Sequence, residues 1–149
     1  ASLSAGWSPA IFRECFVPLL RQHADLVHAY EGIYHVYDDG KMMGTLGDYV
    51  DAEADVVETL TPPPVGDVDL AEAKRLYGDR TCLKGYVDLL YVLKMGTVED
   101  VVRSVRTAIE VAAPGGGFIL GTSDSIREGT PAENVRADFE TAHKYGRYG

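Results

Sequence analysis

Acidic and hydroxyl side chains follow the short apolar runs of this sequence, and these residues are the best suited to chemistry. They are Tyr37, Asp39, Asp88, Ser123 and Asp124. Brought together by a fold, the carboxylates could bind a hard metal ion, transfer protons or hold a cationic ligand. A simpler interpretation stays open for two of them. Asp39 stands in a typical turn sequence, and Asp124 could serve only to cap a loop.

Patterns of helix and strand alternate along the chain and would position these residues. Apolar residues at three- and four-residue spacing predict a helix that begins at Ser8-Pro9, is kinked at Pro18 and ends at Gly32. Further helices are predicted over 46–54, 70–77, 98–112 and 131–145. Runs rich in β-branched and aromatic residues predict strands over 33–37, 55–60, 81–85 and 118–121.

Two helix starts carry a capping-box pattern. Thr97 with Asp100 forms the first, and Thr130 with Glu133 forms the second. In the last helix, spacing predicts an inward face formed by four residues. They are Val135, Phe139, Ala142 and Tyr145.

Strands that alternate with helices predict a parallel sheet with right-handed crossovers. No G-x-G-x-x-G follows the first strand, which argues against a dinucleotide-binding unit. A complete (β/α)8 TIM barrel needs about 250 residues, so we expect an α/β domain over 1–149 that is half of such a barrel. It would hold four parallel βα units preceded by a helix, with the residues after the strands meeting in one mouth. Its open sheet edges predict a homodimer or larger assembly.

Composition excludes several classes of partner. The net charge of -9 argues against nucleic acid and against an anionic membrane surface. No apolar stretch approaches the roughly 20 residues that span a bilayer, and Ala1 to Gly6 lacks the order of a signal peptide.

Cys15 and Cys82 show no disulfide-framework spacing, which suits the cytoplasm, and two cysteines alone cannot form a structural zinc site.

Three segments of the sequence carry a family pattern. They read GDVDLAEAKRLYGDR, LKGYVDLLYVL and GGGFILGTSDSIREGTPAENV. In this order they resemble the C-terminal part of the uroporphyrinogen decarboxylase superfamily, which also contains corrinoid-dependent methyltransferases. The resemblance is strongest over 65–146 and extends more loosely back to Ser8.

The resemblance implies roles for residues after the third and fourth strands. Gly85, Tyr86 and Asp88 fall on the decarboxylases' G-N-L-D loop, with Tyr86 in place of the asparagine, and with Ser123 they would bind substrate. Asp124 occupies the position of a histidine in the decarboxylases and of a zinc-binding cysteine in the methyltransferases.

The methyltransferases' H-x-C zinc ligands are changed in this sequence. An ungapped alignment from Gly40 puts Tyr37 on the histidine and Asp39 on the cysteine, whereas a shift by two puts His35 on the histidine instead. A hard divalent metal on Asp39, Asp124 and His35 would be the remaining possibility. His35 lies within a strand, where a packed barrel residue is the more typical interpretation.

The resemblance therefore implies a carboxy-lyase domain for a small, tetrapyrrole-type substrate, with Asp124, Asp39 and Tyr37 as catalytic residues and no cofactor. We expect the chain alone to be inactive, because the family's substrate-binding arginines and catalytic aspartate lie in the other half of the barrel. One alternative is a methyltransferase with an altered metal site, a methyl donor as substrate and a corrinoid protein as partner. The other is a non-catalytic half-barrel that dimerises.

Overall fold

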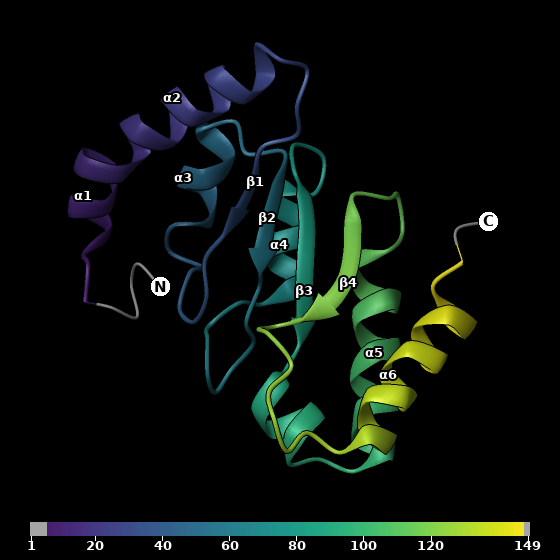
Figure 1. Ribbon diagram of the computed structural model, residues 1–149. Helices are drawn as coiled ribbons and strands as arrows, with labels where there is room; N and C mark the ends of the chain where they lie inside the picture. The colour runs from purple at the N-terminus through teal and green to yellow at the C-terminus, as the bar shows by residue number, and fades with distance from the viewer. Residues whose placement is uncertain (1–5, 148–149) are drawn as a thin grey trace.

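Four parallel strands form one sheet in the order β1-β2-β3-β4 in the computed structural model, which describes residues 6–147 (Figure 1). The strands are β1 (His35–Tyr37), β2 (Val56–Thr59), β3 (Cys82–Val87) and β4 (Phe118–Thr122). Each strand pairs with the next in sequence, and the pairs Tyr37 with Glu58 and Glu58 with Lys84 fix the register. The predicted half of a TIM barrel is confirmed. Residues 1–5, where no signal peptide is expected, lie outside the described range.

Helices connect the strands and flank the sheet. They are α1 (Pro9–Ile11), η1 (Phe12–Phe16), α2 (Val17–His28), α3 (Leu46–Asp51), α4 (Leu70–Tyr77), η2 (Leu89–Lys94), α5 (Val98–Ala112) and α6 (Ala132–Tyr145). The disruption predicted at Pro18 takes the form of the wide π-helical turn η1, directly before α2. This turn accommodates a residue that has no N–H to donate and whose ring crowds the preceding turn.

The core lies between the sheet and the helices that cover one of its faces. Val36, Val57 and Leu83 point to this side, where they join a buried cluster with residues of α3, α4 and α5 that include Leu46 and Ala108. The period of two along a strand turns the alternate residues to the opposite face. That face would form the interior of a closed barrel, and here it is open.

Two of the four residues predicted to face inward from the last helix are exposed. Phe139 is 65% and Tyr145 is 40% exposed, whereas the buried residues of α6 include Asn134 and Ala137. Asn134 is buried because its amide donates to the carbonyls of Leu93 and Gly96 at 2.9 and 2.8 Å, which closes the end of η2.

Of the two capping boxes predicted from the sequence, one is confirmed and the other is wrong. The capping box of Thr97 and Asp100 is confirmed, with both reciprocal hydrogen bonds present. The predicted box at Thr130 is wrong, since Pro131 is the N-cap of α6 and the Thr130 hydroxyl donates to the carbonyl of Arg127 at 2.8 Å. Within residues 6–147, no helix has the length and apolar character needed to cross a membrane.

Candidate active site

A cavity of about 310 Å³ lies at the carboxyl ends of the strands. Segments after all four strands contribute to its lining. The lining residues are Asp39, Gly40, Thr61, Val65, Leu89, Leu90, Ser123, Asp124 and Arg127. Three residues predicted from the sequence, Asp39, Ser123 and Asp124, therefore border the same cavity, as expected for the mouth of a parallel barrel.

Tyr37 connects the end of β1 with the loop after β4. Its hydroxyl donates to Asp124 Oδ1 at 2.7 Å. Burial, and then the hydrogen bond and charge of Asp124, raise the pKa of Tyr37 to about 12. The phenol is therefore neutral at physiological pH and acts as a hydrogen-bond donor.

Asp124 accepts hydrogen bonds from three directions. The Ser125 N–H donates to Oδ1 at 2.7 Å, beside the bond from Tyr37, and the Arg127 guanidinium pairs with Oδ2. Partial burial of Asp124 opposes ionisation, but the bonds from Tyr37, Arg127 and Ser125 prevail and lower the pKa of its carboxyl. Asp124 is thus an ionised carboxylate held in one orientation.

A second polar cluster lies on the open face of the sheet. Glu58 of β2 accepts from Lys84 of β3 at 2.9 Å, and its Oε2 lies 2.7 Å from His35 Nε2 of β1. The strand register places these side chains on neighbouring strands of one face. His35 is thereby paired with Glu58, a partner that sequence spacing did not indicate.

The suggested metal ligands are not assembled as a metal site. Among residues 6–147, no three His, Cys, Asp or Glu side chains are arranged to hold a metal ion. Cys82 begins β3 and Cys15 lies in η1, so neither residue follows a strand end. The donor set of Tyr37, Asp39 and Asp124 has no thiolate and does not fit the zinc site of a thiol-activating enzyme.

Two aspartates near the mouth have structural roles. Asp38 is buried and accepts a hydrogen bond from the hydroxyl of Tyr49 at 2.8 Å. Asp88 is also buried and caps η2, accepting from the Tyr91 N–H at 2.6 Å. Asp88 is not among the residues that line the cavity, and its contact with substrate stays a prediction.

Gly85 and Tyr86, also predicted to bind substrate, lie within β3. Gly85 has φ of +128°, and a Cβ there would lie 1.8 Å from the carbonyl oxygen of Thr59, so only glycine fits. Tyr86 has φ of +93° and lines a different hollow, bordered by the start of α4 and by Thr107 and Val111 of α5. The two unusual backbone conformations turn Tyr86 away from the mouth.

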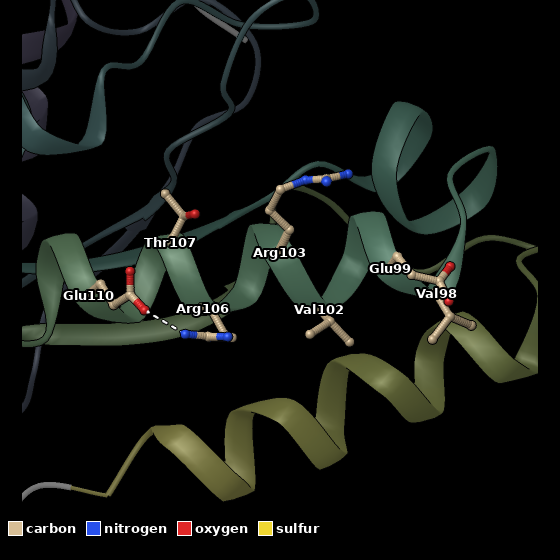
Figure 2. A pocket seen from close by; sticks show the side chains of 7 residues that line it. All are labelled: Val98, Glu99, Val102, Arg103, Arg106, Thr107 and Glu110. Carbon is tan, nitrogen blue, oxygen red and sulfur yellow. Dashed lines mark hydrogen bonds and ion pairs between the residues drawn. The ribbon is translucent and has the colours of Figure 1, made fainter.

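Another hollow, of about 410 Å³, lies along the outer surface of α5 (Figure 2). Its lining comes from this helix alone and includes Arg103, Arg106 and Glu110. Arg106 and Glu110 form an ion pair at 3.3 Å. Long side chains of one helix create this groove, and none of the predicted site residues borders it.

Sequence reasoning missed three apolar residues that line the cavity as binding surface. Val65, Leu89 and Leu90 give it an apolar wall, and Arg127 gives it a cation. Arg127 stands three residues after Asp124, a spacing that could have indicated the ion pair. The leucines could not be assigned, since the π-helical turn that presents them has no simple periodicity.

Comparisons with known proteins agree with this fold. The family model described as uroporphyrinogen decarboxylase (URO-D) matches residues 2–145. Uroporphyrinogen decarboxylase of Thioalkalivibrio sulfidiphilus (strain HL-EbGR7) is 33% identical over 81 residues, which are 53% of this chain and 22% of that protein. A solved methyltransferase from Methanosarcina mazei shares the fold, with a TM-score of 0.77 at 22% identity, over 94% of this chain and 38% of that one.

The chain therefore spans less than half the length of each of these two relatives. The family model nonetheless covers nearly all of its residues. The chain belongs to the uroporphyrinogen decarboxylase (URO-D) family.

Proposed function

We propose that this chain is one half of the catalytic barrel of a carboxy-lyase acting on a tetrapyrrole-type substrate. One observation carries the proposal: the bonded pair Asp124–Arg127 borders a cavity to which segments after all four strands contribute, and Tyr37 donates to Asp124. The 33% identity with a uroporphyrinogen decarboxylase supports this choice of reaction.

The cavity suits a reaction in which positive charge develops on a heterocycle. Decarboxylation breaks a carbon–carbon bond, releases CO₂ and passes the electron pair into a ring-protonated pyrrole without a cofactor. A proton then adds to the carbon that lost CO₂, and the ring gives up its extra proton. A carboxylate fixed in place, such as Asp124, would stabilise the cationic ring. Asp39, on the same cavity, is the second carboxylate available for this role. Tyr37, neutral up to a pH of about 12, holds Asp124 in its orientation.

The chain alone should not turn over this substrate. In a closed barrel a substrate with many carboxylates needs several cations, because a buried carboxylate without a partner is costly. In the half-barrel its other carboxylates stay in water, so it can bind without being turned over. Lys84 is paired with Glu58 and Arg127 with Asp124. The rest of a complete barrel would supply the remaining cations.

The fold match with a methyltransferase keeps methyl transfer as a second candidate. That reaction would use a methyl donor, a corrinoid protein as partner and a divalent metal. At 22% identity the match shows the fold alone, and the donor set does not fit thiol-activating zinc. The remaining alternative is a non-catalytic half-barrel that pairs with a second copy.

Uroporphyrin, the stable oxidised form of the substrate, provides a test. Titration with the chain should shift its Soret band, and Asp39→Ala, which removes a carboxylate that borders the cavity, should weaken this binding. Asp100→Ala, on α5 outside the cavity, should leave it unchanged. Incubation with uroporphyrinogen should give no coproporphyrinogen above background.

An unchanged Soret band would refute the proposed substrate class. Formation of coproporphyrinogen by the chain would refute its dependence on the other half of the barrel. Transfer of a methyl group from methylcobalamin to a thiol would favour the second candidate.

A further inference from the structure

Arg127 borders the active-site cavity through a side chain that is 62% exposed. One guanidinium nitrogen donates to Asp124 Oδ2. Its backbone is fixed, since the carbonyl of Arg127 accepts from both the N–H and the hydroxyl of Thr130, at 3.2 and 2.8 Å. The next carbonyl, of Glu128, accepts from Lys94 at 3.2 Å. The anchor is therefore rigid and the guanidinium faces solvent.

Asp124 would stay bonded if Arg127 moved away. Its Oδ1 keeps the hydroxyl of Tyr37 and the N–H of Ser125, both at 2.7 Å. Because the Arg127 side chain is 62% exposed, water and salt screen its ion pair with Asp124, which therefore contributes little to stability. Of the three hydrogen bonds to Asp124, the one from Arg127 can therefore be broken with the smallest loss of free energy.

The cavity combines this cation with an apolar wall. Val65, Leu89 and Leu90 form the wall, while Thr61 and Ser123 contribute hydroxyls. A volume of about 310 Å³ admits one small ring with its substituents. A planar heterocycle bearing a carboxylate matches both surfaces, with the ring on the leucines and the carboxylate on the guanidinium.

We propose that Arg127 exchanges Asp124 for the carboxylate of a single-ring heterocyclic acid, and so selects acidic ligands at the mouth. The proposal rests on the proposed function and deepens it, since one pyrrole ring of a tetrapyrrole presents this chemistry. Asp124 competes with the ligand for the same guanidinium, so removing its charge should strengthen binding.

Pyrrole-2-carboxylate and its neutral amide, pyrrole-2-carboxamide, are suitable probes. Their affinities for the 149-residue chain can be measured by NMR titration. The wild type should prefer the carboxylate, and Arg127→Gln should lower carboxylate affinity about tenfold with little effect on the amide. Asp124→Asn should raise carboxylate affinity several-fold, because the released guanidinium is offered to the ligand.

Arg103→Gln is a matched control. Arg103 pairs with Asp100 at the same three-residue spacing, on α5 and outside the cavity (Figure 2). This substitution should leave the affinities for the carboxylate and the amide unchanged. Circular dichroism should show that each variant is folded.

Equal carboxylate affinity in wild type and Arg127→Gln, or weaker binding by Asp124→Asn, would overturn the exchange. Absence of carboxylate binding by the wild type would do the same. The proposed function can be refuted while the exchange holds. Arg127-dependent binding of the monopyrrole without any uroporphyrin binding would support the exchange and contradict a tetrapyrrole as the substrate.

Discussion

Asp38 and Asp39 are adjacent in sequence and have different surroundings. The side chain of Asp38 is buried against the hydroxyl of Tyr49, whereas Asp39 borders the cavity. The turn-like sequence Asp-Asp-Gly could not show which of the two side chains is buried, because that depends on which residue continues the strand. The backbone of Asp38 extends the pairing with β2, through the Glu58 carbonyl at 2.7 Å.

Asp38→Ala should therefore lower the free energy of unfolding by about 1–3 kcal/mol, since the buried hydroxyl of Tyr49 loses its acceptor. Asp39→Ala should cost less stability and should change ligand binding instead. Urea denaturation of both variants measures the difference. Equal losses of stability in the two variants would show that Asp39 is also structural.

The bond between Tyr37 and Asp124 predicts two linked titrations. The raised pKa of Tyr37 means that its contribution to stability is present below pH 10.0 and is lost as the pH rises through about 12. The lowered pKa of Asp124 contributes stability above its ordinary value of 3.8, and this is lost as the pH falls through the folded value. Tyr37→Phe should remove the late phenol titration and raise the pKa of Asp124.

Carbon-13 NMR of labelled tyrosine and aspartate side chains would follow both groups. Tyr30→Phe, at a tyrosine that is 83% exposed, is the control and should affect neither titration. A carboxyl of Asp124 that titrates unchanged in Tyr37→Phe would show that the hydrogen bond is absent in solution.

At the scale of elements, the segment from β3 to η2 departs most from the sequence prediction. The strand was expected to end at Gly85 but continues to Val87, and the π-helical η2 was not predicted. Period-based reasoning detects regular strands and α-helices, and it has no pattern for a strand residue at positive φ or for a π turn. The helix α5, with a strong apolar stripe and a capping box, was predicted with its correct ends.

Gly85→Ala should destabilise the sheet by about 3 kcal/mol or more, because the added Cβ meets the backbone of Thr59 at a positive φ. Gly121→Ala, on the adjacent strand, is the matched control, with its nearest contact at 3.7 Å. Denaturation followed by circular dichroism would compare the two. Similar stabilities would mean that β2 and β3 are farther apart than described.

At the scale of the whole molecule, the sheet of residues 6–147 ends at two edge strands, β1 and β4, each paired on one side only. Large apolar residues are exposed on the helices nearest these edges, with Leu19 and Leu26 on α2 and Phe139 on α6 (Figure 1). Apolarity alone assigned Phe139 to the interior. Phe139 lies on a side of α6 that no other element of residues 6–147 covers, as expected for a flanking helix of a half-barrel.

We expect the purified chain to form a dimer or larger assembly that covers these edges. Sedimentation at micromolar concentration should show it, and Phe139→Glu should weaken it without unfolding the chain. A compact monomer that binds no apolar dye would contradict this expectation.

The contact between Gly85 and Thr59 also predicts which residues stay the same among family members that act on different substrates. Gly85 is required by the approach of two backbones, and Asp88 by a helix that needs a cap. Relatives that have changed substrate should therefore keep both residues, since each has a structural role. The loop after β4, which carries Asp124 and Arg127, is free of that constraint and should diverge with the ligand. Among relatives, differences in substrate should therefore coincide with sequence differences in the loop after β4.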